Sequence, residues 1–192
     1  METKSGITYL HPKTFEEWYD WLDKHGEKER SVRLVLPNKN SKTNGITTNE
    51  AVLAALCFGW IDSLAGKYDA NSSFLTFTPR NPKSNWSKPN RERVAQLLEQ
   101  GLMRPQGQKM IDIAKETGTW DLLADIEEGI VPMDVAEALA KNKQAKANFE
   151  AFPPSSRKRI LAWIVTAKRP ETRLTRIEEA IALAEKNIRA NH

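Results

Sequence analysis

Residues 51–78 read AVLAALCFGWIDSLAGKYDANSSFLTFT, and they contain three predicted elements of the N-terminal half. The first part of this stretch, up to Phe58, is apolar almost all round, which predicts a helix buried on most sides and ended by Gly59. Two runs with the composition of strands follow, Ile61 to Tyr68 and Ser73 to Thr78, and the polar residues between them are typical of a turn. The stretch therefore predicts a buried helix followed by a β-hairpin.

The segment before this stretch predicts a further helix and a further strand. Thr14 and Glu17, and again Thr47 and Glu50, have the spacing of a helix-starting capping box. An apolar stripe at helical spacing follows Thr14, and residues 31–36 read as a strand ended by a proline. The order helix, strand, helix, strand, strand predicts an α+β fold, in which a small mainly antiparallel sheet packs with helices in the N-terminal half.

Beyond residue 90 the apolar residues recur at helical spacing, so we expect an all-helical C-terminal half. Asn90 and Ser155 are expected to cap two helices, and prolines at 105, 132 and 170 to open three others, with a short helix near residues 147–152. Residues 1–90 are predicted to form an α+β domain and residues 91–192 a helical region packed on it. One continuous domain is the alternative.

Length and composition suit a globular protein without covalent crosslinks. The chain has 192 residues, six Trp and one Cys, which predicts a sizeable core and excludes an internal disulfide. The lone Cys57 fits a reducing compartment, and no segment has the apolar length of a signal peptide or a membrane span. We expect a cytoplasmic monomer or homodimer that does not insert into membranes.

The net charge of +4 is unevenly distributed along the chain. Residues 79–93 and 153–176 are basic, whereas residues 119–138 are acidic and contain neither Lys nor Arg. These segments can pair with each other inside one fold, or they can present a basic face to an anionic partner. We favour ion pairs and solvated surface.

A candidate ligand site lies where apolar segments run into clusters of polar residues. Arg80 follows a strand end and offers a planar fork for a carboxylate or phosphate, and Asp62 can pair with it or act as a general base. Trp86 can stack on a flat ligand while its polar neighbours hydrogen-bond to that ligand. The predicted site comprises Trp60, Asp62, Arg80, Asn85, Trp86 and Ser87.

Structural interpretations compete with each of these roles. For Asp62 and Arg80 we favour a pair that fixes a turn, and for the Trp86 loop anchoring and ligand binding are equally favoured. Cys57 in its buried helix is expected to be an inert thiol rather than a nucleophile. The three His, at 11, 25 and 192, lack metal-ligand spacing, and no phosphate-loop or dinucleotide motif is present, so neither a metal nor a cofactor is expected.

A secondary basic cluster consists of Lys168, Arg169, Arg173 and Arg176. A helix starts among these residues, so its first amides and the flanking cations can hold an anion, although we slightly favour an internal or interdomain role. Nucleic-acid binding through the basic helices from Arg157 to Arg176 is the alternative ranked last, because the nearby Trp163 lies in the apolar register of its helix.

Four stretches of the chain resemble the YdeI/OmpD-associated family, also called the bacteriocin-protection family. They are ALCFGWIDS at 55–63, FTPRNPKSNWSKPN at 77–90, GLMRPQG at 101–107 and AKRPETRLTRI at 167–177. The resemblance implies a small bacterial cytosolic protein with a helical family-defining segment at about residues 130–190. Arg104 and Met133 depart from the expected residues at helix starts, which are Thr or Ser and an acidic residue. The family supplies no catalytic mechanism to transfer.

The resemblance implies a role in stress or bacteriocin tolerance. Together with the residues above, it leads us to expect a cytosolic protein that binds a small ligand or a protein partner without established catalysis. The ligand is expected to be anionic, with Arg80 facing the anion and Trp86 stacking on it or covering it. A metal-independent enzyme acting on an anionic small molecule, with Asp62 as base and Arg80 as electrostatic stabiliser, is the first alternative.

Overall fold

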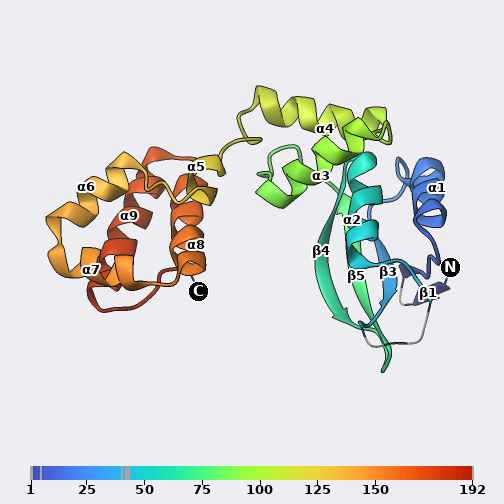
Figure 1. Ribbon diagram of the computed structural model, residues 1–192, viewed down its shortest axis with the longest axis horizontal. Helices are drawn as coiled ribbons and strands as arrows, with labels where there is room; N and C mark the ends of the chain where they lie inside the picture. Colours follow the sequence, from blue (N-terminus) through green and yellow to red (C-terminus); the bar gives the residue numbers. More distant parts are fainter. Residues whose placement is uncertain (1, 5, 40, 42–43, 192) are drawn as a thin grey trace. The chain divides into compact units, whose positions relative to one another are not determined.

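The computed structural model describes residues 2–4, 6–39, 41 and 44–191, and the chain forms two compact units (Figure 1). The first unit comprises Met1–Ser84 and Pro89–Thr119, and the second comprises Asn85–Lys88 and Trp120–His192. The chain therefore crosses between the units three times. Residues 40 and 42–43, before the second expected capping box, and His192, one of the three His without metal-ligand spacing, lie outside the described residues.

A five-stranded mixed sheet forms the centre of the first unit. Its strands are β1 (Glu2–Lys4), β2 (Ile7–Leu10), β3 (Val32–Pro37), β4 (Trp60–Lys67) and β5 (Ser72–Pro79), in the order β1-β2-β3-β5-β4. β2 and β3 run parallel and the other neighbours antiparallel, which confirms the mainly antiparallel sheet. β1 and β2 were not predicted, because strands of three and four residues are too short for alternation to show in the sequence.

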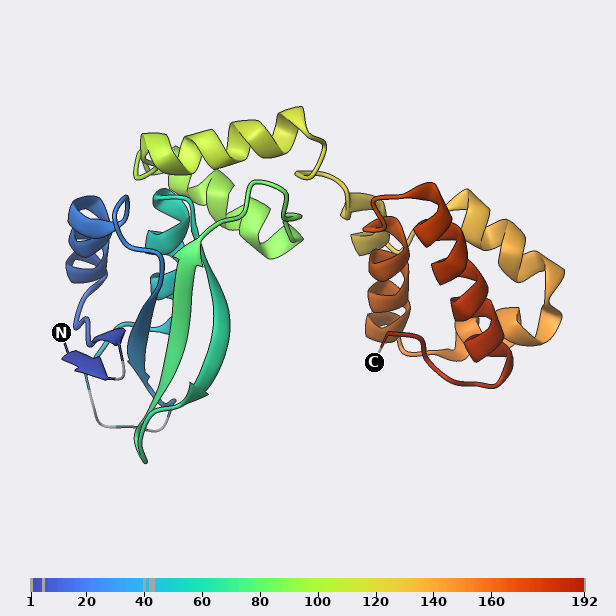
Figure 2. The ribbon, with the colours of Figure 1, turned by 180° about the vertical axis from the view of Figure 1, so that it is seen from behind.

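Helices α1 (Phe15–His25) and α2 (Thr48–Cys57) cover one face of this sheet (Figures 1 and 2). The predicted N-caps of both helices are confirmed, and the capping box of α2 is complete. Trp18 of α1 is fully buried and contacts the Phe77 ring of β5. Its indole N–H donates to the Ala51 carbonyl of α2 at 3.0 Å, so the same side chain joins both helices to the sheet.

α2 is as deeply buried as its apolar sequence predicts, and Cys57 lies in its last turn. The Cys57 thiol is fully buried, and burial raises its pKa to about 12. We expect Cys57 to resist thiol-modifying reagents in the native protein and to react fully once denaturant has unfolded the chain. Spectrophotometric thiol titration at pH 8 measures both reactions, and rapid modification of the native protein would contradict the burial.

α3 (Lys88–Glu99) and α4 (Pro105–Glu116) follow the hairpin. Both helices belong to the first unit, except for Lys88, the first residue of α3. This division differs from the boundary expected at residue 90, since both helices group with the sheet. Asn90 lies inside α3 and does not cap it, which corrects the prediction. The helix starts earlier because the Lys88 backbone N–H already has a partner, the Glu127 carboxylate at 2.6 Å.

The described part of the second unit contains helices and no strand, which confirms the all-helical C-terminal half. Its helices are α5 (Ala124–Glu127), α6 (Met133–Lys141), α7 (Lys143–Ala151), α8 (Pro154–Val165) and α9 (Pro170–Glu185), packed around one apolar core. Ser155 lies in the first turn of α8 and is not its cap, because two prolines already set the backbone for the helix start. Among the described residues, no helix combines the length and the apolar character that crossing a bilayer requires.

Candidate functional site

Trp60, Asp62 and Arg80 lie at one end of the β4–β5 hairpin in the first unit. Trp60 pairs with Pro79 across the hairpin, and the Arg80 backbone N–H donates to the Gly59 carbonyl at 2.8 Å. Trp60 and Arg80 are buried, whereas Asp62 is half-buried. Burial lowers the pKa of the Arg80 guanidinium to about 10, and the Asp62 carboxylate partly offsets this lowering. Arg80 stays charged at neutral pH, and its burial favours a role in the fold.

We expect Arg80→Ala to lower the free energy of unfolding by about 2–4 kcal/mol, because alanine leaves buried space empty where the stem and guanidinium of Arg80 now pack. Urea unfolding followed by circular dichroism measures the change. Lys83→Ala, at an exposed position three residues away, is the control and should cost less than about 0.5 kcal/mol. A fully stable Arg80→Ala protein that no longer binds an anion would instead identify Arg80 as a ligand group.

The other predicted residues, Asn85, Trp86 and Ser87, belong to the second unit. Trp86 is 1% exposed, and its ring packs against that of Trp120 at a centroid distance of 4.9 Å. The next residue but one, Lys88, forms a 2.8 Å ion pair with Glu128 beside α5. The loop is therefore anchored to the second unit through Trp86. That it converges with Arg80 on one ligand stays a prediction.

The secondary basic cluster at the start of α9 divides into two pairs. Arg173 binds the Asp134 carboxylate of α6 with two hydrogen bonds, at 2.7 and 2.9 Å, and this lowers the pKa of Asp134. Arg176 lies over the Trp163 ring at 5.1 Å and donates to the Trp163 carbonyl. Lys168 and Arg169 are exposed. Two of the four cations thus hold helices of the second unit together.

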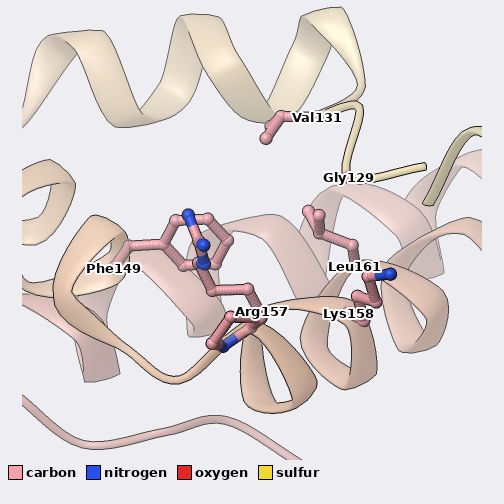
Figure 3. A pocket seen from close by; sticks show the side chains of 7 residues that line it. Gly129, Val131, Phe149, Arg157, Lys158 and Leu161 are labelled. Atoms are coloured by element: carbon pink, nitrogen blue, oxygen red, sulfur yellow. The ribbon is translucent and has the colours of Figure 1, made fainter. Parts of the chain in front are cut away.

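A cavity of about 130 Å³ in the second unit brings together residues that the sequence analysis did not group (Figure 3). In Figure 3, Phe149 and Arg157 lie on one side, Leu161 and Lys158 on the other, and Val131 above them. The walls are mainly apolar. The complete lining is Gly129, Val131, Phe149, Pro154, Arg157, Lys158 and Leu161.

The arrangement follows from helical spacing. Residues 154, 157, 158 and 161 of α8 stand at i, i+3, i+4 and i+7 and so share one face of the helix. Phe149 comes from α7, and Gly129, with a φ of +84°, turns the chain after α5 so that Val131 reaches the opposite wall. The spacing along α8 is a signal that a sequence analysis can find, but it does not reveal which side chains stand opposite.

The cavity carries positive charge without a carboxylate in its lining. Lys158 is exposed, and its ammonium donates to the Glu127 carbonyl. Arg157 is half-buried, and within the described residues its guanidinium makes neither a hydrogen bond nor an ion pair. A half-buried guanidinium beside apolar walls can bind an anion that also carries an apolar group.

Two family models match the chain, one in each half. A model described as a domain of unknown function (DUF8412) matches residues 10–110, and one described as bacteriocin-protection, YdeI or OmpD-associated matches residues 128–187. The second match confirms the resemblance and contains the cavity, although three of the four resembling stretches lie within the first match. Searches of curated proteins and of solved structures found no match.

Proposed function

We propose that this chain is a binding module for a small apolar anion. The chain belongs to the family described as a domain of unknown function (DUF8412). Its residues 128–187, which match the bacteriocin-protection model, are called the bacteriocin-protection segment. The site is the Arg157 cavity, defined by the seven residues that line it. The observation that carries the proposal is the Arg157 guanidinium, which stands at an apolar cavity and has no partner within the described residues.

The size of the cavity limits the apolar part of the ligand. An enclosed apolar cavity of about 150 Å³ binds benzene. A cavity of about 130 Å³ therefore has room for one ring or one branched aliphatic group, and not for a long chain. The walls from Val131, Phe149 and Leu161 suit such a group.

The charge of the cavity limits the polar part of the ligand. A guanidinium binds a carboxylate with two parallel hydrogen bonds. A half-buried guanidinium loses less binding free energy to competing water than an exposed guanidinium does. Lys158 adds a second positive charge nearby. A monocarboxylate with a compact apolar group meets both requirements.

Binding without catalysis is the function that this lining supports. Its seven residues include no Ser, Cys, His, Asp or Glu, so the cavity offers neither a common nucleophile nor a general base other than Lys158, whose ammonium donates to a carbonyl. An enzyme built on Asp62 and Arg80 stays a separate hypothesis, and nucleic-acid binding through the basic helices remains ranked last.

4-Methylpentanoate, a carboxylate with a leucine-sized chain, is expected to bind the wild type and to raise its unfolding temperature. Arg157→Gln should weaken this binding about 10–100-fold, because it removes a charged hydrogen-bonding partner. Isothermal titration calorimetry measures the affinity. Arg159→Gln, an exposed arginine on the same helix outside the cavity lining, is the matched control and should bind as the wild type does. Equal binding by both variants would exclude the Arg157 cavity as the site.

We further propose that the protein acts in the cytoplasm and contributes there to bacteriocin tolerance. The lone Cys57 fits a reducing compartment, and the bacteriocin-protection segment contains the cavity. Bacteriocin sensitivity of a deletion strain complemented with wild type, Arg157→Gln or Arg159→Gln tests the link. Loss of tolerance with Arg157→Gln alone is the expected result, and full tolerance with it would separate the phenotype from the cavity.

A further inference from the structure

We infer that the Arg157 cavity recognises the C-terminal residue of a peptide, with the free carboxylate on Arg157 and one apolar side chain in the cavity. The inference rests on the proposed function, because it names the ligand class of the same site. Three features carry it: the sign of the charges in the lining, a backbone N–H without a partner among the described residues, and an exposed apolar residue next to the lining in the sequence.

The charges discriminate against free amino acids. A free amino acid such as leucine carries an ammonium one carbon away from its carboxylate. The lining holds two cations, Arg157 and Lys158, and no Asp or Glu that can accept from an ammonium. The last residue of a peptide has a neutral amide in that position, so it places its carboxylate and side chain in the cavity without a repelled charge.

The segment between α5 and α6 offers a place for the peptide backbone. Residues 130–132 lie outside any helix, and the Val131 side chain lines the cavity. The Ile130 N–H donates to the Asp125 carbonyl at 2.9 Å, whereas the Val131 N–H makes no hydrogen bond to any described residue. An extended ligand that runs along this segment can therefore accept a hydrogen bond from the Val131 N–H, as strand-like peptide ligands do.

Ile130 is an exposed apolar residue next to the cavity lining in the sequence. It stands between the lining residues Gly129 and Val131, and its side chain is 55% exposed. A peptide whose last side chain fills the cavity continues past the lining, so its preceding residue can contact Ile130. A ligand of a single residue has no preceding residue to contact Ile130. The Ile130→Ala variant therefore distinguishes a peptide site from a site for small carboxylates.

Calorimetric titration of the full chain with four probes tests the inference. They are N-acetyl-Gly-Leu-Leu with a free carboxylate, the same peptide as its C-terminal amide, leucine, and 4-methylpentanoate. The free-acid peptide is expected to bind at least tenfold more tightly than the amide and than leucine. Ile130→Ala, at an exposed position that should not disturb folding, is expected to weaken the peptide about threefold or more and to leave 4-methylpentanoate unchanged.

Each result has one meaning for the peptide inference and a separate meaning for the proposed function. If 4-methylpentanoate binds as tightly as the peptide and Ile130→Ala affects neither, the site takes small carboxylates and the peptide inference is wrong. If the peptide amide binds as tightly as the acid, the carboxylate is not recognised and the inference is likewise overturned. If no carboxylate binds, the proposed function fails as well.

Discussion

Gly107→Ala is expected to destabilise the first unit by more than about 3 kcal/mol, because α4 has no room for a side chain at this position. An added Cβ would lie 2.3 Å from the Cys57 carbonyl oxygen and 2.7 Å from that of Leu56. Both atoms belong to the backbone of the buried end of α2 and cannot move aside as a flexible side chain does. Urea unfolding followed by circular dichroism measures the loss.

Gly101→Ala is the matched control for this prediction. Gly101 has a φ of +67°, and an added Cβ would meet nothing within 4 Å, so only the left-handed backbone is strained. The expected cost is about 1–2 kcal/mol. A Gly107→Ala protein no less stable than Gly101→Ala would mean that α4 does not approach the end of α2 so closely.

Trp86→Ala is expected to cost about 3–5 kcal/mol in the second unit, the loss typical of a large buried aromatic side chain. Trp86 is 1% exposed and packs on Trp120, so alanine leaves a cavity and exposes the partner ring. Hydrogen exchange resolved by residue measures the effect, because it reports the stability of the second unit separately from the first.

Trp86→Phe should recover much of the loss, since a smaller ring still fills part of the space. The same pair of variants separates the two interpretations of the loop. A residue that covers a ligand can be removed from the unliganded protein with little loss of stability. A change below about 1 kcal/mol for Trp86→Ala would therefore favour the covering role and contradict the anchoring role.

The fold of the first unit can be predicted from the sequence where the pattern is long. The apolar run of α2 and the two strands joined by a turn at residues 69–71 are both present, because each has enough residues for periodicity to show. β1 and β2 are missed for the opposite reason. The placement of α3 and α4 with the sheet depends on tertiary contacts, such as Gly107 against α2, that no local pattern contains.

The candidate site shows a different limit. Composition identifies Arg80 and Trp86 as unusual residues near the ends of apolar segments, but it does not tell that both are buried or that they belong to different compact units. Arg173 is paired with the carboxylate of Asp134, 39 residues away in the sequence. Arg157 has no such partner within the described residues. Both look alike in the sequence, as members of one basic run.

The Arg157 cavity itself is formed by three segments that are separate in the sequence, near residue 130, at Phe149 and along α8. Helical spacing groups the α8 residues, yet only the folded unit places Phe149 beside Arg157 and Val131 above them. We therefore propose binding at the Arg157 cavity instead of at the residues around Arg80. The sequence indicated the Arg157 region only through the basic segment at residues 153–176.

Methyl NMR of the protein with labelled Leu and Val, titrated with 4-methylpentanoate, tests whether a small carboxylate binds in the Arg157 cavity. We expect shifts of the Leu161 and Val131 methyl signals and nuclear Overhauser effects between these methyls and the ligand chain. Both should be lost in Arg157→Gln and kept in Arg159→Gln. Saturable shifts confined to methyl groups of the first unit, with the Leu161 and Val131 signals unchanged, would contradict binding in the Arg157 cavity.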